Sequence, residues 1–252
     1  MLLLSACGGG SSTGADSTPA SWSVSGNWQM SLFKDGKTSS KPRTQTGFLV
    51  ASQNNVSGGA IFSSADCSGS TSVSGNVDGN DVVLTTDPTG LSVQLNGKLG
   101  SDKASMSGNY TLLAEGCGAS ETGTWTAILI KALNGTFAGT TDDGKYAISA
   151  GLTQAANDGG SSADITGSLT ISGSPCFPNG ATATVSGLVS GQSVLLNFAD
   201  SNGNQMGQIS GNSPADGSAT SIAGNYRLIG QGLPSCNTNG SSGTVTLSLG
   251  SQ

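Results

Sequence analysis

The feature that most constrains the fold is a pattern that the chain contains twice. Each copy has a strand-like segment that begins Gly-Asn-Tyr, then a cysteine, then a second segment that begins Gly-Thr. The copies are Gly108–Leu113, Cys117 and Gly123–Trp125, and then Gly224–Ile229, Cys236 and Gly243–Val245. A chain of 252 residues can form one large domain or two ordinary ones. The repetition therefore predicts two tandem units of the same fold.

The composition indicates that both units are built from β-strands around thin cores. Only 10% of the residues are charged and 35% are hydrophobic, while glycine alone accounts for 40 residues. Such a chain is poor in helix formers and rich in turn and strand residues. Apolar and polar side chains alternate in several segments, so that Trp28, Met30 and Leu32 share one face of a predicted strand.

Eight short strand-like segments, separated by turn sequences, are predicted in each unit. They extend from Asn27–Phe33 to Gly123–Ile130 in the first unit and include Asp81–Thr86 and Leu91–Leu99. In the second unit they extend from Gly135–Thr140 to Gly243–Leu249 and include Ala181–Gly187 and Ser193–Ala199. Short strands joined by tight turns form a meander, and closing a meander into a barrel removes its exposed edges. We therefore predict an all-β protein with two tandem small antiparallel up-and-down β-barrels of about eight strands each. Two β-sandwiches are the alternative.

The N-terminal segment Leu4-Ser5-Ala6-Cys7 resembles the lipobox of bacterial lipoproteins, which consists of a leucine, two small residues and a cysteine. In that family the chain is cut before the cysteine, and acyl chains on the cysteine anchor the protein to a membrane. The resemblance implies that residues 1–6 are the remainder of a signal peptide and that Cys7 is lipidated. Residues 7–22 would then form the lipidated cysteine and a flexible Gly- and Ser-rich tether. Because Gly8 is not acidic, the resemblance also implies a lipid-anchored protein of the outer membrane in the cell envelope.

Four cysteines remain once Cys7 is assigned to lipidation, two in each predicted unit. The units would be the β-barrel repeats at residues 23–131 and 132–252. An exported protein meets an oxidising environment, in which such cysteine pairs form disulfides. Three pairings can be drawn, and the duplication favours the two within units, Cys67 with Cys117 and Cys176 with Cys236. The absence of a CxxC spacing argues against a metal site.

Charge and residue types narrow the classes of function. The net charge is −6 with only nine Lys and Arg residues, which argues against nucleic acid as a partner. The chain has no histidine, the commonest general base and metal ligand. We therefore expect a protein that is not an enzyme and that has no cofactor and no metal. Asp200–Asn204 is similar to the start of a calcium loop, but Gly211 stands where that loop needs a glutamate, so we interpret the segment as a turn.

Two glutamates of the first unit are candidates for a catalytic pair of the kind that glycosidases use. Glu115 and Glu121 lie in the first unit, while the second unit has Gln231 and Ser241 near the corresponding places. Both glutamates fall in the expected loop around Cys117, where a charged side chain is normally exposed to solvent. We therefore interpret them as loop charges.

The best specific hypothesis is a ligand pocket inside the first barrel. Five aromatic residues could line it: Trp28, Phe48, Phe62, Tyr110 and Trp125. Gly26-Asn27-Trp28 is similar to the Gly-x-Trp of lipocalins, a resemblance that implies a calycin-like barrel. An eight-stranded barrel either fills its interior or holds one small ligand.

Two functions follow from these two states of the barrel interior. The first is an envelope-anchored, non-catalytic module that binds a small apolar ligand. The second is a structural or interaction protein with filled barrels that meets an envelope protein. The second unit has Phe137 in place of Trp28 and Val245 in place of Trp125, so we expect a ligand to bind the first unit.

Overall fold

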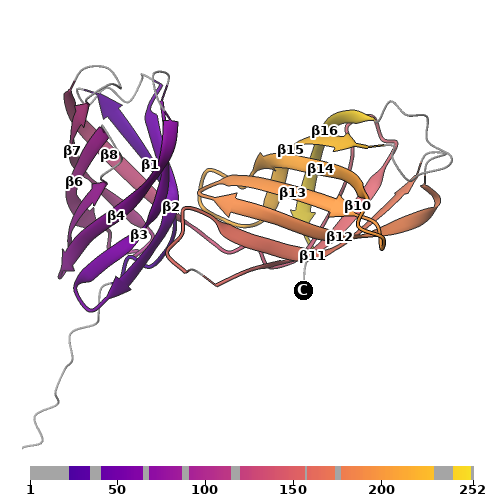
Figure 1. Ribbon diagram of the computed structural model, residues 1–252, viewed down its shortest axis with the longest axis horizontal. Coiled ribbons are helices and arrows are strands. Elements are labelled where there is room, and N and C mark those ends of the chain that lie inside the picture. The colour runs from indigo at the N-terminus through magenta and orange to yellow at the C-terminus, as the bar shows by residue number, and fades with distance from the viewer. Residues whose placement is uncertain are drawn as a thin grey trace, which may run out of the picture.

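The computed structural model describes residues 23–34, 41–64, 68–86, 91–114, 120–156, 158–173, 177–229 and 241–250. Within these residues the named elements are sixteen β-strands that form two closed antiparallel barrels (Figure 1). The same residues contain no helix that is long and apolar enough to cross a membrane.

In the first barrel each strand pairs with the next along the chain, and β8 returns to pair with β1. Its strands are β1 (Gly26–Lys34), β2 (Arg43–Ser52), β3 (Asn55–Ser63), β4 (Ser68–Asp78), β5 (Asp81–Thr86), β6 (Leu91–Leu99), β7 (Ser105–Ala114) and β8 (Glu121–Ile130).

The second barrel repeats this order and is closed by a short strand, β9, which pairs with both β10 and β16. Its strands are β9 (Gly135–Thr140), β10 (Ala147–Gln154), β11 (Ala163–Gly173), β12 (Phe177–Ser190), β13 (Ser193–Ala199), β14 (Gln205–Asn212), β15 (Ser221–Leu228) and β16 (Ser242–Leu249). The prediction of two tandem up-and-down barrels is confirmed, and the sandwich alternative is wrong.

The strand registers show which positions of the two barrels correspond. Tyr110 pairs with Gly123 across β7 and β8, and Tyr226 pairs with Gly243 across β15 and β16. On the other side of each barrel Trp28 pairs with Gly47, and Phe137 pairs with Ala150. A side chain in one barrel can therefore be compared with the side chain at the same place in the other.

One end of the second barrel abuts the side of the first (Figure 1). The Asn27 carboxamide, on the outer face of β1, makes two buried hydrogen bonds to the turn at Gly191. Its Nδ2 donates to the Gly191 carbonyl at 2.8 Å, and its Oδ1 accepts from the Gly191 N–H at 2.7 Å. The hydroxyls of Thr46 and Ser190 share a further hydrogen bond of 2.8 Å.

Two glycines allow the barrels to approach this closely. A Cβ on Gly59 would lie 2.6 Å from the backbone nitrogen of Ser161. Gly191 has a φ of +55°, a region that favours glycine, and a Cβ there would lie 2.5 Å from Oε1 of Gln29. Specific hydrogen bonds and backbone contacts of this kind fix one arrangement of the barrels.

Candidate functional site

Four of the five aromatic side chains predicted to line a pocket lie in the core of the first barrel. Trp28, Phe62, Tyr110 and Trp125 are each no more than 2% exposed and belong to one buried cluster. Both indoles are fixed by hydrogen bonds to carbonyl oxygens. Nε1 of Trp28 donates to Val24 at 2.7 Å, and Nε1 of Trp125 donates to Asn96 at 3.2 Å.

Phe48 does not join this cluster, which corrects its predicted place inside the first barrel. The alternation along β2 directs Gln45 and Leu49 inward, so Phe48 faces outward. Its side chain is buried in the core cluster of the second barrel, and its backbone N–H donates to the Gly160 carbonyl at 3.3 Å. Phe48 therefore stabilises the junction between the barrels.

A charged cluster lies inside the first barrel around Glu121, a residue expected to be exposed in a loop. That expectation was wrong, because Glu121 begins β8 and its side chain is only 2% exposed. Arg43 donates to both carboxylate oxygens, from Nε at 2.7 Å and from an Nη at 3.1 Å. The Tyr110 hydroxyl donates to the same carboxylate at 2.8 Å, and the Lys34 ammonium lies 3.7 Å away.

These contacts decide the ionisation of Glu121. Burial by itself raises its pKa, but the hydrogen bonds from Arg43 and Tyr110 and the charges of Arg43 and Lys34 together hold the pKa below its ordinary value. A glycosidase general acid needs a raised pKa, so Glu121 does not fit that role. Its proposed partner, Glu115, lies outside the described residues.

Next to this cluster lies a buried polar side chain that sequence reasoning missed. Gln45 follows Arg43 on the inner face of β2 and is 0% exposed. Its neighbours across the strands are Met30 on β1 and Phe62 on β3, both apolar. Neither Nε2 nor Oε1 of Gln45 has a hydrogen-bond partner among the described residues. Buried amides are nearly always paired, so this carboxamide marks a place where a polar partner is needed.

The second barrel lacks this arrangement at the corresponding positions. Ile148 takes the place of Gln45, Tyr146 that of Arg43, and Ser241 that of Glu121. The Tyr146 hydroxyl shares a 2.9 Å hydrogen bond with the Ser241 hydroxyl. The Tyr146 ring packs edge to face against the Tyr226 ring, with the ring centroids 6.1 Å apart. A charged interior has been replaced by an aromatic one.

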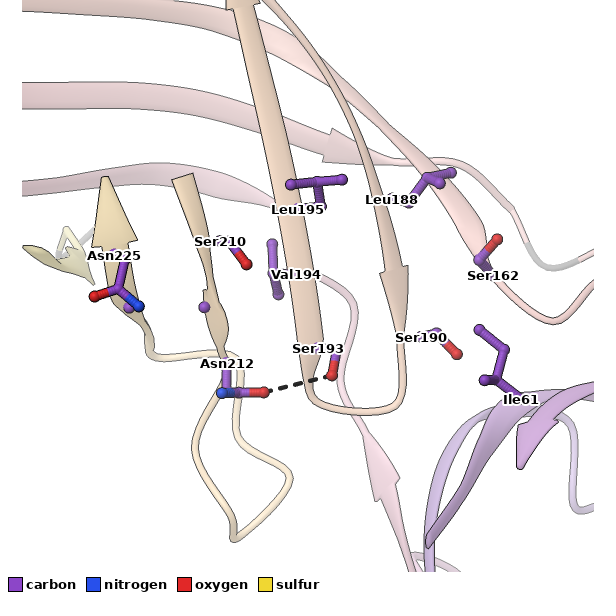
Figure 2. A pocket seen from close by; sticks show the side chains of 12 residues that line it. Ile61, Ser162, Leu188, Ser190, Ser193, Val194, Leu195, Ser210, Asn212 and Asn225 are labelled. Atoms are coloured by element: carbon purple, nitrogen blue, oxygen red, sulfur yellow. Dashed lines mark hydrogen bonds between the residues drawn. The ribbon is translucent and has the colours of Figure 1, made fainter. Parts of the chain in front are cut away.

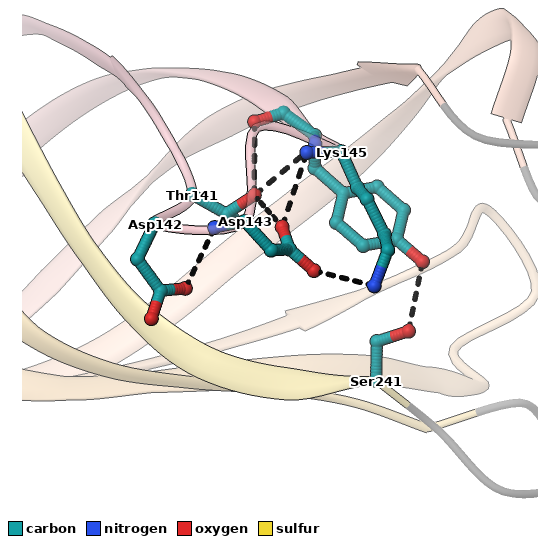
Figure 3. A network of polar contacts seen from close by, with 6 residues as sticks. Thr141, Asp142, Asp143, Lys145 and Ser241 are labelled. Carbon is teal, nitrogen blue, oxygen red and sulfur yellow. Dashed lines mark hydrogen bonds and ion pairs between the residues drawn. The ribbon is translucent and has the colours of Figure 1, made fainter.

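Charges in this part of the second barrel lie on the connection from β9 to β10 (Figure 3). The Lys145 ammonium lies 2.8 Å from the Asp143 carboxylate, which also accepts a hydrogen bond from the Thr141 hydroxyl at 2.8 Å. Hydrogen bonds from Lys145, first of all, lower the pKa of Asp143 to about 2. The same interaction raises the pKa of Lys145. This pair is exposed and holds a turn in place.

The segment that is similar to the start of a calcium loop forms a turn. Asp200 caps its own turn, since its carboxylate accepts hydrogen bonds from the backbone N–H groups of Asn202 and Asn204 at 2.8 Å. No cluster of three or more metal-ligating side chains occurs among the residues that the structure describes. Cys7, Cys67, Cys117, Cys176 and Cys236, with the predicted lipid and disulfides, lie outside those residues.

Comparisons with known proteins show only weak similarity to a solved structure. No family model matches the chain, and no curated protein matches it. Among solved structures, kievitone hydratase from Nectria haematococca is 12% identical, with 90% of each chain covered and a TM-score of 0.25. That protein is an enzyme by its name, which contradicts our prediction that this chain is not an enzyme, and we withdraw that prediction. A likeness with so low a TM-score carries no argument for a reaction, so no activity is inferred from it.

Proposed function

We propose that the first barrel binds a small, mostly apolar ligand that carries one polar group. The unpaired carboxamide of Gln45 is the observation that supports this proposal. A buried polar group without a hydrogen bond costs about 1–3 kcal/mol, and a ligand that pairs with it recovers that free energy. The second barrel has Ile148 at the same place, so the fold itself does not require an amide there.

The surroundings of Gln45 indicate the chemistry of the ligand. Met30 and Phe62 offer apolar contacts on both sides, which suits an apolar body. The carboxamide offers one donor group and one acceptor, so the polar group of the ligand should accept and donate, as an amide or a hydroxyl does. The charge of Arg43 is matched by that of Glu121 at 2.7 Å, so a net charge on the ligand is not needed.

We further propose that the protein is a lipoprotein of the cell envelope. The lipobox-like segment that ends at Cys7 supports an acyl anchor, and residues 7–22 would tether the barrels to the outer membrane. The two intra-unit disulfides belong to the same proposal, because they require export to an oxidising compartment.

Native mass spectrometry tests the binding proposal. The full chain with Cys7→Ser, purified from the envelope fraction of its own host, should carry a mass beyond that of the polypeptide. The excess should disappear in Gln45→Ile and persist in the matched control Ile148→Gln, which changes the same position of the second barrel. A bare polypeptide mass, or an excess that Gln45→Ile leaves intact, would overturn the proposal.

A second candidate is a structural or interaction protein with filled barrels. The observation that favours it is the dense aromatic core of the first barrel, in which Trp28 and Trp125 are both 0% exposed. The same experiment separates the two candidates, because a filled barrel has no bound mass to lose.

A further inference from the structure

A groove lies where the outer face of the second barrel meets the first barrel (Figure 2). It has a volume of about 510 Å³, within the range of small-molecule sites, and the first barrel contributes Ile61 to it. Four outward-facing residues form a row across β12 to β15, each paired with the next in the strand registers: Leu188, Leu195, Ser210 and Asn225. This site is separate from the barrel interior discussed above.

The apolar end of this row is unusual for an exposed sheet surface. Leu188 and Leu195 are directly paired across β12 and β13, and they are 45% and 36% exposed. The corresponding pair in the first barrel is Asn76 with Val83. Two adjacent leucines therefore occupy a place that the same fold fills elsewhere with an amide and a smaller side chain.

The next outward-facing row, two residues further along each strand, is charged in the first barrel and uncharged in the second. In the first barrel this row contains Asp78, Asp81 and Lys98, and the last two form an ion pair. The second barrel has serines at 190 and 193 and an asparagine at 212 at those positions. Figure 2 shows the neutral hydrogen bond that replaces the ion pair, from the Ser193 hydroxyl to Asn212 Oδ1 at 3.5 Å.

We propose that this groove binds a neutral, hydroxyl-rich ligand with one apolar face, such as a short oligosaccharide. Serine hydroxyls and the carboxamides of Asn212 and Asn225 both donate and accept hydrogen bonds, as sugar hydroxyls do. The leucine pair gives the apolar face of a sugar ring a surface to cover. None of the described residues that line the groove is charged, so an ionic ligand would lose hydration without gaining a partner.

The topology disfavours an extended peptide as the occupant. Extended peptides commonly bind by adding a strand to the exposed edge of a sheet. The second barrel is closed between β9 and β16, and the groove lies over paired strands in the middle of the sheet. An oligosaccharide needs only side-chain donors, acceptors and an apolar surface, which this face provides.

The two barrels supply matched variants for a test. Ser193→Asp with Asn212→Lys gives the second barrel the ion pair found in the first barrel. Leu188→Asn with Leu195→Val replaces the two leucines by the residues at the corresponding positions of the first barrel, Asn76 and Val83. These residues already occur at the same positions of the same fold, so both variants should fold. Titrations of the full chain with maltotriose, cellotriose and chitotriose, followed by NMR chemical shifts, should show one neutral trisaccharide binding, with shifts at the Asn212 and Asn225 side chains.

The expected results are specific to this face. Each double variant should weaken binding of that trisaccharide at least tenfold, Gln45→Ile should leave it unchanged, and the charged analogue trigalacturonate should not bind. The proposal is overturned if none of the three neutral trisaccharides binds at millimolar concentration, or if the double variants leave the affinity intact. It is equally overturned if the protein dimerises in sedimentation experiments and Leu188→Asn with Leu195→Val abolishes the dimer, because the leucines would then serve a second copy.

Discussion

Replacing Gln45 by isoleucine should stabilise the ligand-free protein, although most substitutions of buried residues destabilise. The carboxamide is 0% exposed, and its two polar atoms have no partner among the described residues. Isoleucine keeps a side chain of similar size and has the β-branched shape that strands favour. The corresponding position of the second barrel already holds Ile148, which is 2% exposed in a packed core.

The magnitude follows from the unpaired carboxamide, counted as one polar group. One unsatisfied buried polar group costs about 1–3 kcal/mol, so removing the amide should raise the free energy of unfolding by about 2 kcal/mol. For a protein of this size, each kcal/mol moves Tm by about 2–4 °C. The mirror substitution Ile148→Gln places an amide among apolar side chains and should lower the free energy of unfolding by a similar amount.

Urea unfolding of protein refolded from denaturant, and thus free of ligand, measures these changes. Gln45→Met serves as a second variant because methionine keeps the unbranched shape of glutamine while removing both polar atoms. If both variants lower the stability of the ligand-free protein by more than about 1 kcal/mol, Gln45 has a partner in the folded state and the reasoning fails. With ligand bound, the order should reverse, because binding stabilises only the protein that retains Gln45.

Three further results are expected. Asn27→Ala removes two buried hydrogen bonds to Gly191 and should cost about 2–4 kcal/mol at the junction, so that calorimetry resolves two transitions instead of one. The folded-state pKa of Glu121 is lowered, so its ion pairs stabilise the protein at pH values above the ordinary pKa of 4.5 and are lost as the pH falls below it. Glu121→Gln should therefore make stability depend less on pH in acid unfolding experiments in that range. An unchanged acid unfolding curve would contradict this. Cys67→Ser with Cys117→Ser should cost on the order of 3–4 kcal/mol, whereas free thiols in the native protein would argue against the bridge.

The strands could be predicted because their signal is local. Alternating side chains and turn residues placed all sixteen, and Asp81–Thr86, Leu91–Leu99 and Ser193–Ala199 have the predicted bounds. The main error of length concerns β12, predicted as Ala181–Gly187 and observed as Phe177–Ser190. Glycine and polar residues at its ends weaken the alternation, while pairing with the long strand β11 extends it.

The site could not be predicted in the same way, because it depends on contacts between distant residues. The buried carboxylate of Glu121 is paired with Arg43, which lies 78 positions earlier in the chain. Phe48 lies between Gly47 and Leu49, and in such an apolar run only the register shows which side chain faces the second barrel. The contrast between Gln45 and Ile148 is visible only when the two repeats are aligned by strand register, which the structure supplies.

The internal duplication turns such contrasts into an argument about function. Both barrels have the same strand order, so a residue that differs between corresponding positions is not demanded by the fold. The two sets of differences compared above lie on opposite faces of the sheet: Gln45 against Ile148 inside, and Asp81 against Ser193 outside. The interior difference introduces an unpaired polar group in the first barrel, and the exterior one removes charge in the second. If each barrel has its own ligand, variants of one site should leave binding at the other unchanged, whereas a single shared ligand would require both sets to act together.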